Sequence, residues 1–223
     1  MIRAVLFDLD GTLLHSAPDL VAALNQVRTL HCLPEHELEA MQQYASRGAV
    51  GLLQAGMPAA DPDTLELWRH AFLAHYEKNS ARDSALFEGI VELLAFLDSK
   101  GVPWGIVTNK PEYLTRPVLA AFGLDRSLGC LVCGDTIDQR KPHPAPVRLA
   151  CEVLGVSAAD TLMVGDDVRD LQAGMAAGVK TCAVLYGYGS NEFSKAENEA
   201  FLSGAIMVES PRDLMAWLQN EVV

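Results

Sequence analysis

The chain has 223 residues, of which 50% are hydrophobic and 21% charged, which is enough for one large domain or a domain with an insertion. Its formal net charge of −12 argues against nucleic-acid binding, because that function needs a basic face. No apolar run approaches the roughly 20 residues that cross a bilayer, and acids interrupt the apolar N-terminal stretch. We therefore expect no membrane span, no signal peptide and a cytoplasmic location.

The first predicted strand covers residues 3–8, and a long helical stretch follows from about 17 to 80. One helical face is expected to carry Leu20, Leu24, Val27 and Leu30, and another Leu65, Trp68, Phe72 and Tyr76. Between them, Pro34 is expected to begin a further helix. We interpret residues 16–81 as a helical cap inserted into a core formed by residues 1–15 and 82–223.

Strands and helices alternate in the second part of the chain. Strands are predicted at 102–108, 130–133, 161–165, 180–186 and 205–209. Helices are predicted at 88–100, 111–122, 144–154, within 166–178 (with Val168, Leu171 and Met175 on one face) and at 211–220, and a polar loop extends to about 203. This alternation indicates right-handed βαβ units. The predicted fold class is α/β, a Rossmann-like parallel sheet covered by helices, with the inserted helical cap.

Chemically useful side chains gather at the predicted carboxyl ends of the strands, where open α/β sheets bind ligands. They are Asp8 and Asp10 after the first strand, Thr108, Asn109 and Lys110 after the second, Lys141 in the loop after the third, and Asp166, Asp167 and Asp170 after the fourth. Several carboxylates around one point repel each other unless a cation joins them, and hard oxygen ligands favour Mg²⁺. A threonine, a lysine and helix N–H groups are donors for a phosphate. A carboxylate beside both could attack phosphorus, and a second could protonate the leaving oxygen.

Four short segments, "DLDGT", "VTN", "RKPHP" and "VGDDVRD", resemble in this order the four motifs of the haloacid dehalogenase superfamily. The resemblance implies that Asp8 is the nucleophile and Asp10 the general acid/base. It implies that Thr108 and Lys141 hold the phosphoryl oxygens. The Mg²⁺ ligands that it implies are Asp8, the Asp10 carbonyl and Asp166, with Asp167 or Asp170 in support.

Longer segments narrow the resemblance within the superfamily. An aspartate two residues after the nucleophile fits cleavage of phosphate esters. The runs "GIVTNKP", "KPHPAP", "VGDDVRDLQAG" and "LYGYG" are similar to the phosphoglycolate phosphatase group and, within it, to N-acetylmuramic acid 6-phosphate phosphatases. Both substrates carry a carboxylate, and we expect Arg47, in the cap, to pair with it; an exposed Arg47 at a helix end is the alternative. We also expect Gly48, Asn109 and Lys110 to contact the substrate. His15 stands where the family usually shows an aspartate, at the hinge into the cap.

Other functions remain open at this stage. The leading hypothesis is a Mg²⁺-dependent phosphatase acting on a small-molecule phosphate ester as a monomer or weak homodimer. The alternatives are a sugar-phosphate mutase, a signalling module phosphorylated on aspartate, and a catalytically silent binding protein. The C-x-x-C of Cys130 and Cys133 is interpreted as part of a buried strand rather than a redox or zinc site.

Overall fold

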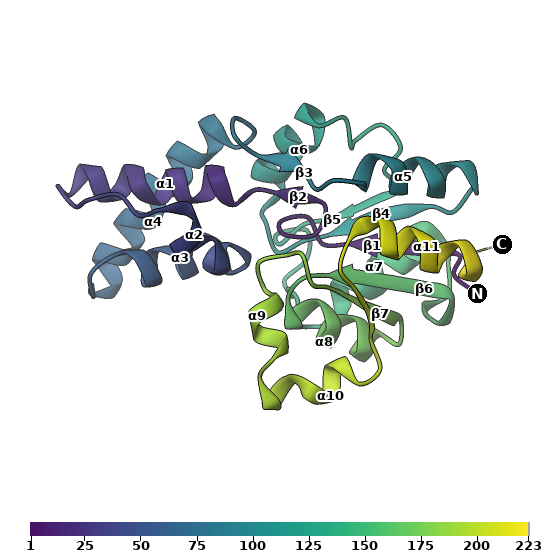
Figure 1. Ribbon diagram of the computed structural model, residues 1–223. Coiled ribbons are helices and arrows are strands. Elements are labelled where there is room, and N and C mark those ends of the chain that lie inside the picture. Colours follow the sequence, from purple (N-terminus) through teal and green to yellow (C-terminus); the bar gives the residue numbers. More distant parts are fainter. Residues whose placement is uncertain (223) are drawn as a thin grey trace.

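The computed structural model describes residues 1–222, apart from the side chain of residue 191, and within them it contains a six-stranded sheet (Figure 1). The strands are β1 (Ala4–Phe7), β4 (Trp104–Val107), β5 (Cys130–Val132), β6 (Thr161–Gly165), β7 (Lys180–Val184) and β8 (Ile206–Val208). They lie in the order β5-β4-β1-β6-β7-β8, and every pair is parallel. The predicted α/β class is thus confirmed.

Helices cover both faces of this sheet. They are α5 (Ile90–Ser99), α6 (Glu112–Ala121), α7 (Ala145–Leu154), α8 (Val168–Ala177) and α11 (Pro211–Glu221). Val5 and Phe7 of β1 pack with α5, α6 and α11, whereas Leu6 packs with α7 and α8. Alternate residues of one strand therefore reach two different apolar layers, as a doubly covered strand requires. Because β1 is central, the residues that follow it lie in the middle of one sheet edge.

A separate group of helices projects from that edge (Figure 1). It consists of α1 (Ala17–Leu30), α2 (Leu38–Met41), a 3₁₀ helix (Gln42–Arg47), α3 (Gly48–Gly56) and α4 (Pro62–Asn79). These helices enclose an apolar core of their own. The chain enters and leaves them through an antiparallel pair, β2 (Leu14–His15) and β3 (Ala85–Leu86). The division at residues 16 and 81 stays a prediction, but the region is helical as expected.

The buried carboxylate of Asp19 fastens this junction. It accepts hydrogen bonds from the main-chain N–H groups of Asp83 (2.9 Å) and Ser84 (3.0 Å), and from the Ser84 hydroxyl at 2.5 Å. The start of α1 is thereby tied to the segment that follows α4. The two chain crossings between cap and core consequently stay side by side.

Several local predictions were wrong. Leu30 is 62% exposed because α1 ends there and the chain turns away at Cys32, which has a φ of 56°. Met175 is 43% exposed because α8 faces the sheet through Leu171 and Gly174, where a side chain would collide with Thr181. The helix expected from Pro34 begins only at Leu38 and continues as the 3₁₀ helix.

The expected polar loop up to residue 203 also differs. It contains α9 (Ser190–Phe193), a 3₁₀ helix (Ala196–Asn198) and α10 (Glu199–Leu202), and a further 3₁₀ turn lies at Ala158–Asp160. The loop's apolar residues, Phe193, Phe201 and Leu202, pack beside Leu171 of α8. Burial of these side chains against α8 explains the local order.

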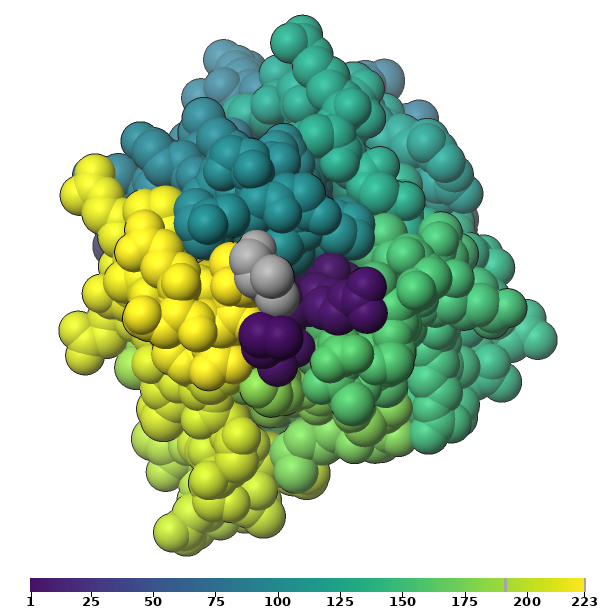
Figure 2. Space-filling model, turned by 90° about the vertical axis from the view of Figure 1, so that its right-hand side faces the viewer, coloured from purple at the N-terminus to yellow at the C-terminus, as the bar shows by residue number. Residues whose placement is uncertain are grey.

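The ends of the described chain meet on the side remote from the cap. The Ile2 N–H donates to the Glu221 carbonyl at 2.8 Å. Figure 2 shows the purple N-terminal residues beside yellow α11 on that side.

All five cysteines, which lie in the described part of the chain, are free thiols, and Cys130 and Cys133 are buried. No helix described here is long and apolar enough to pass through a bilayer.

Candidate active site

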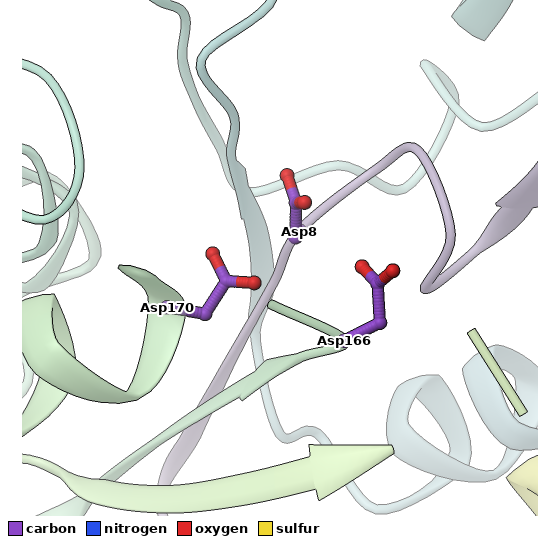
Figure 3. Close-up of side chains that lie close together, drawn as sticks. All are labelled: Asp8, Asp166 and Asp170. Atoms are coloured by element: carbon purple, nitrogen blue, oxygen red, sulfur yellow. The ribbon is translucent and has the colours of Figure 1, made fainter. Parts of the chain in front are cut away.

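Three carboxylates converge beyond the carboxyl ends of the two central strands. Asp8 follows β1, Asp166 follows β6, and Asp170 lies in the first turn of α8. Figure 3 shows the three side chains pointing into one space. One oxygen from each lies within 4.8 Å of the others, and this is the one such cluster of metal-type ligands among the residues described.

Asp166 and Asp170, the two fully buried members of this cluster, have raised pKa values. Burial, reinforced by the charge of Asp8, raises the pKa of Asp166 to about 7. Burial also raises the pKa of Asp170 to about 8, against the opposing effect of Lys141. Such shifts mean that the charged forms are costly as the groups stand. An all-oxygen set that repels itself in this way fits a hard divalent cation.

Asp166 is held by main-chain and side-chain donors from three segments. Its Oδ1 accepts from the Thr12 hydroxyl at 3.2 Å. Its Oδ2 accepts from the N–H groups of Tyr188 and Gly189, both at 3.0 Å, and from the Ser46 hydroxyl at 2.9 Å. Gly11 has a φ of +90°, and a Cβ there would lie 2.3 Å from this carboxylate. The glycine of "DLDGT" thus leaves room for Asp166.

Lys141 lies between the nucleophile candidate and Asp170. Its Nζ is 2.9 Å from Asp8 Oδ1 and 2.6 Å from Asp170 Oδ1. The angles are outside hydrogen-bond geometry, so Asp8 Oδ1 and the Lys141 amine have no hydrogen-bond partner among the described residues. Asn109 fixes this lysine by exchanging two hydrogen bonds with its main chain, at 2.9 and 3.0 Å. The Lys141 ammonium is therefore ion-paired with both carboxylates but hydrogen bonded to neither.

Asp10 has a different lysine as its partner. Lys110 Nζ lies 3.0 Å from Asp10 Oδ1, 3.1 Å from Asp10 Oδ2 and 2.6 Å from the hydroxyl of Tyr76, which belongs to α4 of the cap. Thr108, at the end of β4, accepts from the Lys110 N–H through its hydroxyl at 3.2 Å. Thr108 is buried and lines the cavity described below.

Asp167 lies apart from the carboxylate cluster. Its side chain caps α8 and forms an ion pair with Arg169, at 2.8 Å to Nε and 2.9 Å to Nη2. Asp170, by contrast, joins Asp8 and Asp166. Of the two acids expected in support of the metal, the geometry favours Asp170.

A cavity of about 740 Å³ opens between the core and the cap. Its core side includes Asp8, Asp10, Thr108, Asn109, Lys110 and Lys141, and its cap side includes Leu20, Arg47, Gly48, Phe72, Leu73 and Tyr76. Arg47 stands at the rim with 51% of its side chain exposed and forms an ion pair with Glu192 at 2.8 Å. Gly48 follows it with a φ of +62° and opens α3. The structure thus brings every predicted substrate-contacting residue to one cavity, although their roles stay predictions.

The cap hinge carries His15 on β2. Its Nδ1 lies 2.6 Å from the Tyr188 hydroxyl, which also accepts from the Ala17 N–H at 3.0 Å. Burial lowers the pKa of His15 below its ordinary value. His15 therefore joins the hinge to the segment that holds Asp166.

Comparison with known proteins gives this geometry its context. The model of the haloacid dehalogenase-like hydrolase family matches residues 5–184. The chain belongs to this family. It is 38% identical to the N-acetylmuramic acid 6-phosphate phosphatase of Pseudomonas aeruginosa, over 96% of this chain and 93% of that protein. It is 39% identical to a phosphoglycolate phosphatase of Xanthomonas campestris, over 97% of this chain and 98% of that one.

A solved structure agrees with these sequence relationships. The crystal structure of a predicted phosphoglycolate phosphatase from Haemophilus somnus superposes with a TM-score of 0.85 at 28% identity, and covers 98% of both chains. The protein is accordingly a haloacid dehalogenase-type phosphatase of the phosphoglycolate phosphatase-like group, as the motifs predicted.

Three residues of the site in this haloacid dehalogenase-like hydrolase were not predicted: Ser46, Tyr76 and Arg169. Ser46 reaches from the cap to Asp166, and Arg169 donates from its Nη2 to the Ser46 carbonyl at 2.6 Å. Arg169 lies inside the fourth motif, which is the one signal that the sequence offers. Its contact with the cap depends on how two remote segments meet, and no local pattern encodes that meeting.

Proposed function

We propose that this phosphatase hydrolyses a small carboxylate-bearing phosphomonoester in a Mg²⁺-dependent reaction that passes through an aspartyl-phosphate on Asp8. The observation that carries the proposal is the position of Asp8. It lies within 4.8 Å of Asp166 and Asp170 oxygens, 2.9 Å from Lys141, and two residues before Asp10. Nucleophile, phosphate-binding cation and a second carboxyl group therefore meet at one point.

Asp8, Asp166, Asp170 and the main-chain carbonyl of Asp10 would hold Mg²⁺. Bound there, the ion supplies positive charge that offsets the charge of the phosphoryl group and the carboxylates. Lys141 and Thr108 bind the remaining phosphoryl oxygens and aim the phosphorus at Asp8. The cap closes the cavity and keeps bulk water from the reacting atoms.

In the first step an Asp8 oxygen attacks phosphorus while the bond between phosphorus and the ester oxygen breaks. Protonated Asp10 gives its proton to that oxygen, and the alcohol leaves. In the second step Asp10 removes a proton from water, whose oxygen attacks the phosphorus. The bond between phosphorus and Asp8 breaks, so inorganic phosphate is released and both aspartates return to their starting forms.

Two substrates fit the carboxylate requirement, 2-phosphoglycolate and N-acetylmuramic acid 6-phosphate. Arg47 at the rim is placed to pair with the carboxylate of either, in exchange for Glu192. A cavity of about 740 Å³ lies within the range for drug-sized ligands, and its cap side is partly apolar. Its size favours the sugar acid over the two-carbon acid. In this proposal the enzyme works in the cytoplasm, as its free thiols suggest, as a monomer or weak homodimer.

The test is phosphate release from both compounds, side by side, with Mg²⁺ and with EDTA. We expect release with Mg²⁺ alone and a higher kcat/KM for the sugar acid. A higher value for 2-phosphoglycolate would reverse the substrate choice, and release in EDTA would contradict the metal assignment. Transfer of phosphate to a sugar hydroxyl with little net release would identify a mutase instead.

The Arg47→Gln variant should lose more kcat/KM with these acids than with p-nitrophenyl phosphate; an equal loss would remove Arg47 from carboxylate recognition.

A further inference from the structure

Lys110 is a buried cation whose hydrogen-bonding capacity is filled. A lysine ammonium has three N–H donors. The described acceptors are the two oxygens of Asp10, at 3.0 and 3.1 Å, and the Tyr76 hydroxyl at 2.6 Å. The ammonium also lies 4.5 Å from the centre of the Tyr76 ring, within cation–π range. No N–H of this group is left for a substrate oxygen.

The same contacts with Asp10 and Tyr76 favour the charged form of the Lys110 amine. Burial would lower the pKa of its ammonium, but the charge of Asp10 and the hydroxyl of Tyr76 outweigh burial and raise the pKa. Its side chain is 6% exposed. A buried ammonium with both contacts in place is held in one position, since leaving it would strand two charges.

We propose that Lys110 is a positioning residue for the general acid/base rather than a substrate-binding residue, and that Tyr76 completes its position from the cap. The inference rests on the proposed function, because it assigns Lys110 a part in the proton transfers of Asp10. Lys110 grips both oxygens of Asp10 and so fixes the plane of the carboxyl group. Lys141 serves the phosphoryl group, and Lys110 serves Asp10.

The cap takes part through the side chain of Tyr76. Tyr76 lies on α4, whereas Lys110 follows β4 of the core. Their contact exists only while α4 lies over the sheet edge. Closing the cap thus completes the setting of Asp10 at the moment when the substrate is enclosed, which links acid/base readiness to substrate binding.

Steady-state kinetics with 2-phosphoglycolate and p-nitrophenyl phosphate would test this for Lys110→Met, Asp10→Asn and the double variant. We expect Lys110→Met to lower kcat by about 10²-fold, within the usual range for acid/base catalysis, with KM changed less than about threefold. In the Asp10→Asn background the same change should cost less than about threefold, because its target is gone. A raised KM with unchanged kcat would overturn the inference. So would a loss of kcat from Lys110→Met that is as large in the Asp10→Asn background as in the unaltered protein.

Controls separate this role from a structural one. Lys78→Met removes an exposed lysine from the same cap helix as Tyr76 and should leave kcat unchanged. Tyr76→Phe removes only the hydroxyl and should lower kcat in the same direction, by about three- to tenfold, in a folded protein that melts a few degrees lower because one buried N–H of Lys110 loses its acceptor. If Lys110→Met does not fold, Lys110→Gln keeps a polar group there and takes its place.

A crystal structure of Lys110→Met gives a readout that does not depend on turnover. The Asp10 carboxyl group should rotate away from its present plane while Asp8, Asp166 and Asp170 stay in place. An unmoved Asp10 would overturn the positioning role, whatever the enzyme hydrolyses. Inactivity of the unaltered protein on every ester would instead contradict the proposed function alone.

Discussion

Asp8 and Asp10 are close in sequence, yet each has its own lysine. Asp8 lies 2.9 Å from Lys141, and Asp10 lies 3.0 Å from Lys110. The first pair lacks hydrogen-bond geometry, and the second is fully hydrogen bonded. One carboxylate is thus left free to react, while the other is held in place.

Replacing the nucleophile should stop turnover without unfolding the protein. We expect Asp8→Asn to lower kcat at least about a thousandfold, because an amide is a poor nucleophile. The side chain keeps its shape, so the melting temperature should change little. Stopped-flow or endpoint phosphate release measures the first quantity, and circular dichroism the second. Near-normal activity in a folded variant would contradict the assignment.

The raised pKa values predict how metal binding depends on pH. In the unfolded chain Asp166 and Asp170 titrate near 3.8, but in the folded protein their pKa values are about 7 and 8. Between these limits the folded state binds more protons, so the metal-free protein should lose stability as pH rises from about 4 to 8. Protons and Mg²⁺ compete for the same oxygens.

The corresponding measurement is the melting temperature at pH 5, 6, 7 and 8, with and without Mg²⁺. The increase caused by Mg²⁺ should grow with pH, since fewer protons remain to be displaced. Asp166→Asn serves as the control and should lose most of the increase at every pH. A Mg²⁺ effect that is constant from pH 5 to 8 would contradict binding at these carboxylates.

Which site residues the sequence could reveal depends on what places them. Asp8, Thr108 and Asp166 follow apolar strands, and parallel strands bring their carboxyl ends to one edge. Their meeting was therefore predictable. The contacts of Lys110 with Tyr76, and of Ser46 with Asp166, join segments about 34 and 120 positions apart across the cap interface. Only the packing of the cap determines these pairs.

At the scale of elements, the cap contacts the core at two places. Tyr76 of α4 contacts Lys110 beyond β4. The 3₁₀ helix makes the second contact, where the Ser46 hydroxyl donates to Asp166 and the Ser46 carbonyl accepts from Arg169. Because Asp166 is a candidate metal ligand, the position of the cap and the carboxylate cluster share a residue.

Removing the contact between Arg169 and the cap should weaken substrate binding. In Arg169→Lys the bidentate contact with Asp167 cannot be reproduced, and the bond to the Ser46 carbonyl is lost. We expect KM to rise about three- to tenfold, with faster hydrogen exchange in residues 42–47. Arg148→Lys is a matched control, since Arg148 donates to the Ala176 carbonyl within the core. Similar effects in both variants would contradict the cap-fastening role.

The elements themselves were predictable to different degrees. The sheet strands are apolar runs between turn residues and were predicted within two residues of their bounds. The short helices α9 and α10 were missed because Phe193, Phe201 and Leu202 are spread through a polar segment. These short helices are stabilised by packing of their apolar side chains on α8. The exposed Met175 shows the same limit, since Gly174 shifts the buried face of α8.

At the scale of the molecule, the net charge of −12 opposes an anionic substrate. In the proposed function the attraction would come instead from the local charge of Lys141 and from the metal cation held by the carboxylate cluster. Added salt screens long-range repulsion, with a Debye length of about 10 Å at 0.1 M. We expect kcat/KM to rise a few-fold between about 0.02 and 0.2 M KCl, and more steeply for 2-phosphoglycolate than for the less charged p-nitrophenyl phosphate. A fall in kcat/KM over this range would show that local attraction dominates.

The two ends of the described chain lie together on the side opposite the cap (Figures 1 and 2). A tether on Met1, which is 72% exposed, or on Glu221 therefore attaches the enzyme to a support through the core rather than through the cap. The cap then faces outward, with solvent on its free side. Chain-end coupling should therefore preserve specific activity where random coupling through surface lysines would not.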